Sequence, residues 1–259
     1  MRKGHLLSIM EYLELFLYRN SAAVAALTHS FKENLVSRNI PPDKIHVVLN
    51  GVDLPRYGPR IRNTHLAASW GIDDKFVVGY LGTHGMAHGL VNVLEAAEKL
   101  ENRKNILFLL VGAGSERDML MNEAARRHLD NVIFMPSQTK ETMPEIWSLC
   151  NVALVHLKDS PAFADVLPSK LFEAMAMGLP VLLVSPEGEA SRLVSSHGVG
   201  PWVIAGQPDI LAETVETLFR DKNLLASYAT ASLKTAPLYS REKQAEEMLR
   251  VLEQTVTKR

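Results

Sequence analysis

The sequence predicts an α/β protein whose main domain is a doubly wound parallel sheet. From Lys75 onward, short apolar runs alternate with helical patterns, which is typical of a parallel sheet covered on both faces. Four of the runs contain consecutive branched residues, as strands buried on both sides do. The composition, 47% hydrophobic and 22% charged, fits a folded globular chain and excludes disordered and fibrous classes.

The first sixty residues do not share this alternation. The patterns there predict a helix at 5–19, a strand at 22–27, a helix at 29–37 and a strand at 45–49, followed by a turn-rich linker from Asn50 to about Asn63. A two-stranded parallel piece leaves large apolar areas uncovered. We therefore expect these residues to be the tail of another domain.

The main domain has six predicted strands with helices between them. The strands are predicted at 76–81, 106–111, 132–135, 152–156, 181–184 and 202–205. The helices are predicted at 90–101, 115–127, 140–149, 169–177, 188–197 and 208–219. After a break near Pro237, a terminal helix is predicted at 240–256. In such a sheet, ligands bind in the crevice at the carboxyl ends of the strands.

Charge and cysteine content exclude several function classes. The 28 Lys and Arg nearly balance the 29 Asp and Glu, giving a formal net charge of -1 and no electrostatic case for nucleic acid or an anionic membrane. Cys150 stands alone, which excludes an internal disulfide and a cysteine-based metal site and agrees with a reducing compartment. The nine histidines show no metal-ligand spacing, so no metal site is expected.

The amino-terminal helix is apolar but does not read as a signal peptide or a spanning helix. Glu11 and Glu14 interrupt the apolar run, and no other stretch reaches about 18 apolar residues. We therefore expect a cytoplasmic protein. Leu6, Leu7, Met10, Leu13 and Leu17 recur at helical spacing, which favours packing on other protein and leaves peripheral membrane contact open.

The segment 165–181 contains residues suited to a diphosphate. Pro168 suits the first turn of a helix and Ser169 can supply a hydroxyl there, so free amides at this end would attract anions. Lys170 adds a positive charge, and Glu173 lies one turn further on, where a carboxylate can accept both hydroxyls of a ribose. On spacing alone, Lys170 and Glu173 fit equally well as an i, i+3 surface pair.

Two glycine-rich turns follow the first two strands of the main domain. In Gly82-Thr83-His84-Gly85-Met86-Ala87-His88-Gly89, glycines let the backbone approach a phosphate. In Gly112-Ala113-Gly114-Ser115, the pattern predicts a tight turn with Ser115 as a helix cap. Neither turn has the full spacing of a dinucleotide fingerprint.

The chain resembles a known family at these residues. Asp165 and Glu173 enclose seven residues and are followed by Ala-Met-Ala-Met-Gly-Leu-Pro-Val, which looks like the donor-site signature of retaining nucleotide-sugar glycosyltransferases built from two Rossmann-like domains (GT-B fold; group 1, family 4). The run 167–173 is similar to the subset that builds bacterial surface polysaccharides. Asn50-Gly51-Val52-Asp53 resembles the family's interdomain linker, and the run 24–30 resembles the end of its first domain.

The resemblance implies a division of the chain and a function. Residues 1–55 would be a remnant of the acceptor-side domain with its linker, 56–237 the nucleotide-sugar-binding domain, and 238–259 a helix that crosses back. The implied function is donor binding for transfer of a hexosyl or N-acetylhexosaminyl group from a UDP-linked sugar to a polysaccharide or glycolipid acceptor, with retention and without a metal or other cofactor. Self-association or pairing with a missing first domain is expected to complete the enzyme.

The resemblance also implies the site residues. Lys170, Asp165 and Glu173 are expected to act in catalysis. The residues expected to bind the donor are Gly82, Thr83, His84, Gly85, His88, Pro136, Leu167, Pro168, Ser169, Lys170 and Glu173. The chain departs from the family at three of these positions, where many members carry Arg for Thr83, Lys for His88 and Glu for Asp165. Lys170 is therefore the main fixed cation expected at the diphosphate.

Two other functions remain open on the same fold. A UDP-sugar 2-epimerase would need additional acids and histidines from elsewhere, and a nucleotide-sugar-binding subunit would need no catalytic group at all. The sequence gives no support for hydrolysis by a Ser/His/Asp triad, because it contains no Gly-x-Ser-x-Gly elbow.

Overall fold

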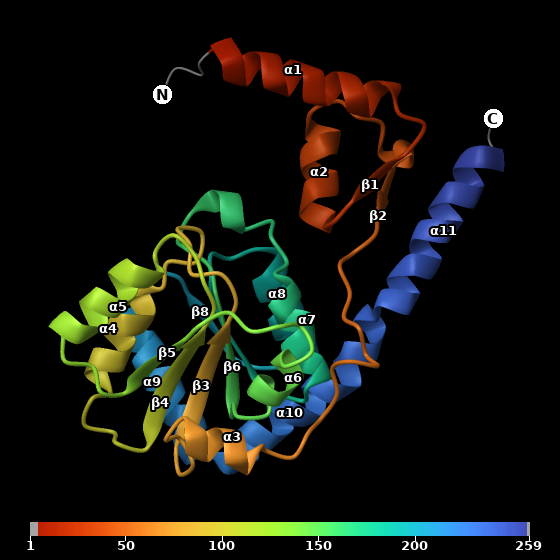
Figure 1. Cartoon of the computed structure of the whole chain (residues 1–259). Coiled ribbons are helices and arrows are strands. Elements are labelled where there is room, and N and C mark those ends of the chain that lie inside the picture. Colours follow the sequence, from red (N-terminus) through yellow and green to blue (C-terminus); the bar gives the residue numbers. More distant parts are fainter. Residues whose placement is uncertain (1–4, 258–259) are drawn as a thin grey trace. The chain divides into compact units, whose positions relative to one another are not determined.

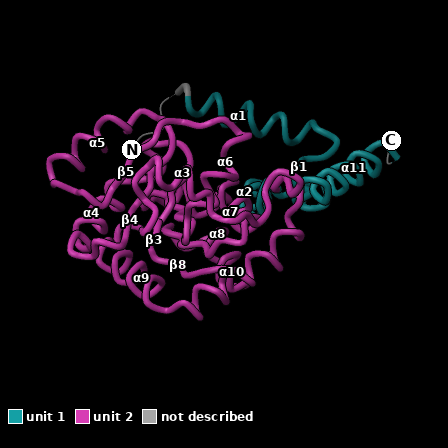
Figure 2. Tube along the Cα trace, turned by 60° about the horizontal axis from the view of Figure 1, so that its bottom comes forward, with its two compact units in different colours: residues 1–51, 241–259 teal, residues 52–240 magenta. Residues whose placement is uncertain are grey.

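The computed structural model describes residues 5–257 and divides the chain into two compact units. Unit 1 is formed by residues 1–51 together with 241–259, and unit 2 by residues 52–240 (Figure 2). Unit 2 holds the large sheet, and unit 1 holds two short strands and three helices among the described residues.

Unit 2 is built on one parallel six-stranded sheet in the order β5-β4-β3-β6-β7-β8 (Figure 1). The strands are β3 (Phe76–Leu81), β4 (Ile106–Val111), β5 (Val132–Met135), β6 (Val152–His156), β7 (Val181–Ser185) and β8 (Trp202–Ile204). β3 pairs with β4 along its whole length, from Phe76 opposite Ile106 to Leu81 opposite Val111. The predicted fold class and all six predicted strands are confirmed.

Helices cover both faces of this sheet, and the sheet separates two hydrophobic cores. One core packs α4 (Val91–Lys99), α5 (Arg117–Arg126) and α9 (Pro208–Arg220) against the sheet. The other packs α3 (Thr64–Ser69), α6 (Met143–Trp147), α7 (Ser169–Ala176) and α8 (Glu189–His197). The helix α10 (Lys222–Thr235) contributes partly buried residues to both cores and contacts α7 and α9. Successive side chains of each strand alternate between the two cores, which is why the strands read as continuous apolar runs.

Two helices of unit 2 are not among the predicted elements. The helix α3 begins directly after the predicted linker, which ends at about Asn63. It is only six residues long and is fixed by Asn63, whose side-chain oxygen accepts from the Leu66 amide at 3.0 Å. The helix α10 buries Ser232 and Thr235 and leaves its apolar residues half-covered or exposed. An apolar stripe is therefore too weak to reveal it.

Unit 1 has a small parallel sheet and its own core. Its elements are α1 (His5–Asn20), β1 (Val24–Ala26), α2 (His29–Ser37), the 3₁₀ turn η1 (Pro42–Lys44), β2 (Ile45–Val47) and α11 (Arg241–Thr257). β1 and β2 pair in parallel, and Leu35 and Ile40 pack with their buried side chains. Thr28 caps α2, because its hydroxyl accepts from the Phe31 amide at 3.1 Å.

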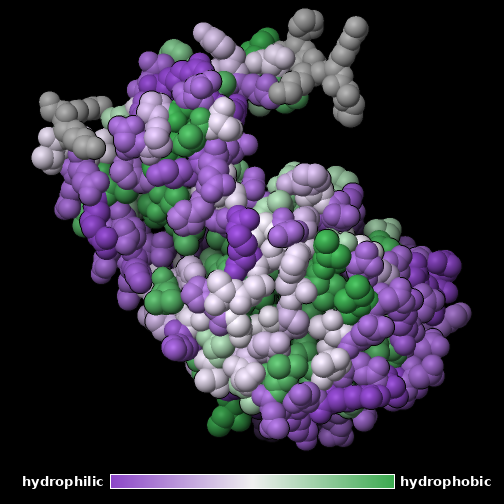
Figure 3. Space-filling view, turned by 180° about the vertical axis from the view of Figure 1, so that it is seen from behind, coloured by the Kyte–Doolittle hydropathy of each residue, from purple (hydrophilic) through white to green (hydrophobic). Residues whose placement is uncertain are grey.

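The helix α1 exposes most of its apolar side chains within unit 1. The exposed ones are Leu7, Ile9, Met10, Tyr12, Leu13, Phe16 and Leu17, and the side chain of Leu6 lies outside the described part. On the face shown in Figure 3, hydrophobic residues form separate groups between hydrophilic ones. Across residues 5–257, no helix combines the length and the apolar character needed to cross a bilayer.

Candidate functional site

The strand order of unit 2 marks the carboxyl ends of β3 and β6 as the place where a ligand crevice is expected. The chain moves outward from β3 to β4 and β5 on one side and from β6 to β7 and β8 on the other, so β3 and β6 flank the point where the winding reverses. Loops leaving two such strands diverge, and ligands of open α/β sheets bind between them. Here the loops are 82–90, after β3, and 157–168, after β6.

The turns after β3 and β4 pack directly on each other. A Cβ atom on Gly112 would overlap the carbonyl oxygen of Gly82, and one on Gly114 would overlap the backbone of His84. Both glycines also have positive φ, +154° for Gly112 and +156° for Gly114, a conformation that side chains disfavour. The His84 amide donates to the Ala113 carbonyl at 2.8 Å. These glycines bring the two backbones together at the carboxyl ends of β3 and β4.

Lys170 extends from the first turn of α7 to the Gly82 turn. Its Nζ lies 3.7 Å from the ring centroid of Tyr80, which is a cation–π distance. A Cβ atom on Gly82 would come within 2.8 Å of the same Nζ, so the absence of a side chain there makes room for the ammonium group. The Nζ atom is buried and has no hydrogen-bond partner among residues 5–257. A buried donor without a partner is costly unless a ligand satisfies it.

The environment of Lys170 controls its charge. Burial disfavours the ammonium form and lowers the pKa of Lys170 from 10.5 to about 7, while the negative charge of Glu173 acts in the opposite direction. Lys170 is therefore close to its titration midpoint at neutral pH. An anion that reaches Nζ would favour the charged form, so binding of the anion and protonation of Lys170 are coupled.

Three histidines surround this position in different ways. His84 is fully buried, neither ring nitrogen has a hydrogen-bond partner, and burial, with smaller effects of the Arg117 and Lys170 charges, lowers its pKa to about 4. His156 is tied down: its Nδ1 lies 2.6 Å from the His88 carbonyl and its Nε2 2.9 Å from the Asn92 side-chain oxygen. Burial lowers the pKa of His88 as well. Burial therefore favours the neutral form of all three imidazoles.

The amino end of α7 has no side-chain cap. Pro168 occupies the cap position itself, in an extended conformation, and Ser169 is the first helical residue. The predicted helix at 169–177 also begins at Ser169, so Pro168 precedes the helix and does not lie in its first turn. Leu167 packs against the hydrophobic core, which anchors the loop leading into the helix. The first amides of α7 are consequently left without a side-chain acceptor, as in helix ends that bind anions.

Some expected site residues lie apart from Lys170. Asp165 is half-buried and follows Ala164, whose carbonyl accepts from the Glu189 amide at 2.7 Å, so this loop is attached to the start of α8. Among the described residues, no hydrogen bond or ion pair links Asp165 with Lys170. Pro136 is exposed just after β5. The structure thus gathers Gly82, Thr83 and Lys170 around Tyr80 and leaves the roles of Asp165 and Pro136 without a contact that supports them.

Two residues of this region are not among the predicted site residues. Tyr80 lies within an apolar strand and reads as core, although its hydroxyl donates to the Thr83 carbonyl at 2.7 Å. Arg117 is the first residue of α5, and its Nε is buried without a partner. A polar side chain at the end of a buried strand is the signal that could have identified Tyr80. The expectation that Ser115 caps α5 is wrong, because Glu116 holds that position and no side chain caps it.

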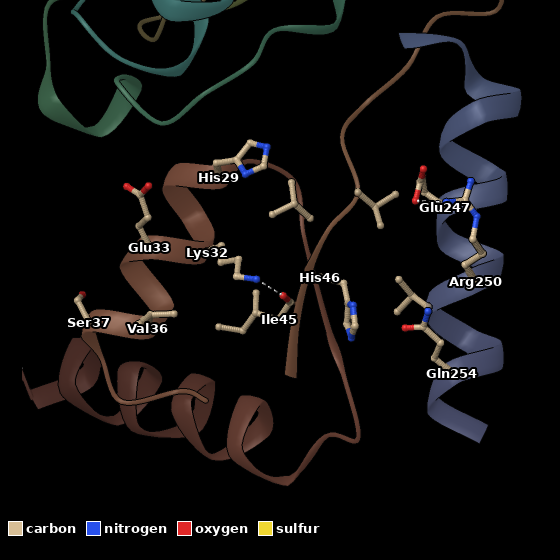
Figure 4. Close-up of a pocket in the computed structure, with 13 residues that line it drawn as sticks. His29, Lys32, Glu33, Val36, Ser37, Ile45, His46, Glu247, Arg250 and Gln254 are labelled. Carbon is tan, nitrogen blue, oxygen red and sulfur yellow. Dashed lines mark hydrogen bonds and ion pairs between the residues drawn. The ribbon is translucent and has the colours of Figure 1, made fainter. Parts of the chain in front are cut away.

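Two other kinds of site, a metal site and a pocket in unit 1, give less support for a function. Within residues 5–257, no group of three or more His, Cys, Asp and Glu side chains is arranged to hold a metal ion. Unit 1 has a pocket of about 790 Å³ whose lining contains none of the expected donor residues (Figure 4). The pocket is lined from α2, β2 and α11, and at one side Lys32 donates to the Ile45 carbonyl at 2.8 Å.

Comparison with solved structures supports the fold assignment. The chain superposes with a TM-score of 0.81 on Anabaena HepE in complex with UDP-glucose, at 20% identity, covering 95% of this chain and 67% of that one. It superposes with a TM-score of 0.73 on WaaG, a glycosyltransferase involved in lipopolysaccharide biosynthesis, at 19% identity, covering 95% of this chain and 70% of that one. At these sequence identities, both similarities support the fold and say nothing of the substrate.

Three curated relatives of the chain are glycosyltransferases by name. An uncharacterized glycosyltransferase of Methanocaldococcus jannaschii is 26% identical over 82% of this chain and 54% of its own length. A GDP-mannose-dependent alpha-mannosyltransferase of Mycobacterium tuberculosis is 26% identical over 77% of this chain and 50% of its own length. A putative colanic acid biosynthesis glycosyl transferase of Escherichia coli is 37% identical over 41% of this chain and 26% of its own length. The chain spans about half the length of the first two.

Two family models together cover most of the chain. The model described as Glycosyltransferase Family 4 matches residues 1–56. The model described as Glycosyl transferases group 1 matches residues 63–235, which is more than half of the chain and includes every expected donor residue. The family match agrees with the Rossmann-like strand order, and the chain belongs to the group 1 glycosyl transferases.

Proposed function

We propose that unit 2 binds the diphosphate of a UDP-linked sugar and that the protein transfers the sugar to a polysaccharide or glycolipid acceptor with retention. The observation that carries this proposal is the buried, unpartnered Nζ of Lys170 at the carboxyl edge of the sheet. Membership in the group 1 family supports the reaction type. UDP and retention are proposed from the resemblance in the donor-site run, and the complex of HepE with UDP-glucose supports UDP.

The site can supply hydrogen bonds and one adjustable charge to a diphosphate. Lys170 would donate to phosphate oxygens, and the uncapped amino end of α7 would add amide donors and the positive end of its dipole. As the glycosidic bond breaks, negative charge grows on the leaving phosphate, and donors already in place stabilise that charge. Glu173, one turn along α7 from Lys170, is proposed to accept the ribose hydroxyls.

Neutral imidazoles complete the proposed donor site. His84 can donate one hydrogen bond without adding charge, and the Gly82 turn allows the backbone to approach the phosphate closely. We propose that no metal ion is needed, because Lys170 and the helix end would balance the diphosphate charge. The neutrality of His88 leaves Lys170 as the group whose protonation changes near pH 7.

Unit 1 is proposed to lie on the acceptor side of the enzyme. Its α1 exposes a row of large apolar side chains, which supports association with a further apolar surface, either protein or membrane. Light scattering of the purified chain, and its flotation with lipid vesicles, would show which of the two occurs.

Calorimetry with UDP and UDP-glucose tests the donor assignment. We expect Lys170→Met to weaken UDP by about 10- to 150-fold, the range of a hydrogen bond to a charged group, and to leave uridine binding nearly unchanged. Glu173→Ala should weaken UDP more than pyrophosphate, because it removes only the ribose partner. Lys104→Met is the matched control, since Lys104 is exposed at the amino edge of the sheet, just before β4.

Three outcomes would contradict the proposal. If the wild-type protein does not bind UDP at millimolar concentration but binds another nucleotide, the assignment of uridine as the nucleoside of the donor is refuted. Equal losses for uridine and UDP in Lys170→Met would make Lys170 structural. A product whose anomeric configuration, read by NMR, is inverted relative to the donor would refute retention.

A further inference from the structure

We propose that Tyr80 is a positioning residue of the diphosphate site, with its ring holding the Lys170 ammonium and its hydroxyl holding the Gly82 turn toward the same anion. This inference rests on the proposed function, because it needs an anion at Lys170. Tyr80 would touch no substrate atom itself. It would act through two partners that lie far apart in the sequence and belong to different elements.

Tyr80 is placed rigidly enough for this role. It lies in β3, the central strand at the switch point, and its side chain is completely buried. The β3 backbone is paired on both sides, with β4 along its length and with β6 at Val78 and Gly79. A side chain on such a strand has few rotamers open to it, so its two ends define fixed positions in space.

The ring of Tyr80 provides the support that Lys170 otherwise lacks. The Nζ of Lys170 has no hydrogen-bond partner, and the aromatic face at 3.7 Å stabilises a desolvated ammonium electrostatically. A ring face attracts the cation without consuming its N–H donors in hydrogen bonds. The three donors of the ammonium group therefore stay available for phosphate oxygens.

The hydroxyl of Tyr80 fixes the turn on the other side. It donates to the Thr83 carbonyl at 2.7 Å, and this bond joins the end of β3 to the residue after Gly82. The rings of His84 and His88 lie 5.9 and 5.8 Å from the Tyr80 ring, so Tyr80 contacts each polar residue of the turn. Moving Tyr80 would therefore displace both the turn and Lys170.

The two ends of Tyr80 can be tested separately by a double-mutant cycle. Tyr80→Phe keeps the ring and removes the hydrogen bond to Thr83. Replacing Tyr80 with a ring-fluorinated phenylalanine differs from Tyr80→Phe in that it weakens the negative face of the ring while filling nearly the same space. Each change is made in the wild-type chain and in Lys170→Met. Binding of UDP-glucose and of inorganic pyrophosphate is measured by calorimetry, and thermal unfolding confirms that each variant folds.

We expect each change to have its own pattern. Tyr80→Phe should weaken both ligands about fivefold in both backgrounds, because the turn is loosened whether or not Lys170 is present. Fluorination should weaken both ligands by about a further tenfold when Lys170 is present and should have no effect in Lys170→Met. Tyr57→Leu, which removes another buried tyrosine of unit 2, should leave binding unchanged.

The outcomes separate this inference from the proposed function. Equal effects of fluorination in both backgrounds, or no effect in either, would overturn the positioning role of the ring. Full affinity in Tyr80→Phe would overturn the role of the hydroxyl. If the wild-type protein binds pyrophosphate but not UDP-glucose, the donor assignment is wrong. The double-mutant cycle measured with pyrophosphate then still tests the positioning role of Tyr80. If neither ligand binds, both proposals are wrong.

Discussion

Affinity for a nucleotide sugar is expected to fall as the pH rises above 7, because Lys170 must be charged to hold the diphosphate. Its pKa of about 7 means that half of the empty sites carry the proton at pH 7, about one in eleven at pH 8 and about one in a hundred at pH 9. If only the charged form binds tightly, the affinity falls about tenfold for each pH unit in this range. At high pH the affinity of the wild-type protein should level off at the affinity of Lys170→Met, which lacks the charge at every pH.

Other groups near the site do not titrate in the same window. The pKa values of His84 and His88 are lowered, so both are neutral above pH 7, and burial raises the pKa of Tyr80. The two phosphates of UDP-glucose carry one charge each throughout this range, whereas the terminal phosphate of UDP ionises near pH 6. UDP-glucose is therefore the better ligand for this measurement.

Calorimetry in buffers of different ionisation enthalpy measures the coupled proton directly. At pH 8, binding should take up about 0.9 proton from the buffer, and Lys170→Met should reduce this uptake to near zero. Lys104→Met should behave like wild type. Affinity that stays constant from pH 6.5 to 9, with a binding enthalpy independent of the buffer, would refute a neutral lysine in the empty site.

Three further measurements test the packing of unit 2. Gly112→Ala should lower the free energy of unfolding in urea by about 1–3 kcal/mol, because a Cβ there overlaps the Gly82 carbonyl, whereas Gly58→Ala, with nothing within 4 Å, should be nearly neutral. Cys150, whose pKa burial raises to about 12, should react with a thiol reagent only after unfolding, so rapid labelling of native protein would contradict its burial. The pKa of His156 is lowered to about 4, so stability should fall as the pH drops from 6.5 toward 4, by at most about 1.4 kcal/mol per pH unit from this group. His156→Gln should reduce that slope, and an unchanged slope would contradict the assignment.

The strands of unit 2 could be predicted from the sequence because each is buried on both faces. Runs such as 106–111 contain only apolar residues, and every residue of β4 is buried. Burial on both faces removes the alternation that would mark a surface strand and leaves a short run bounded by turns. The helix α10 has no comparable signal, because few of its residues are fully buried, so its existence depends on tertiary packing that the sequence pattern does not reveal.

The chemistry of the site could be predicted only in part. A glycine-rich turn after a strand and a lysine at the start of a helix are local patterns, and both appear where expected. The contact between Lys170 and Tyr80 is long-range, and a tyrosine inside an apolar run reads as core. Burial of Nζ is likewise a property of the packed state. The low pKa of Lys170 therefore could not be inferred from the residues alone.

Burial of the Nζ atom also explains why position 170 suits lysine better than arginine. A buried charge without a partner is strongly unfavourable, and a guanidinium cannot release its proton at any physiological pH. An ammonium group can become neutral in the empty site and regain its proton when a diphosphate arrives. Lys170→Arg should therefore destabilise the empty protein, and its affinity for UDP-glucose should no longer vary between pH 7 and 9. Retention of the wild-type pH profile in Lys170→Arg would mean that another group titrates.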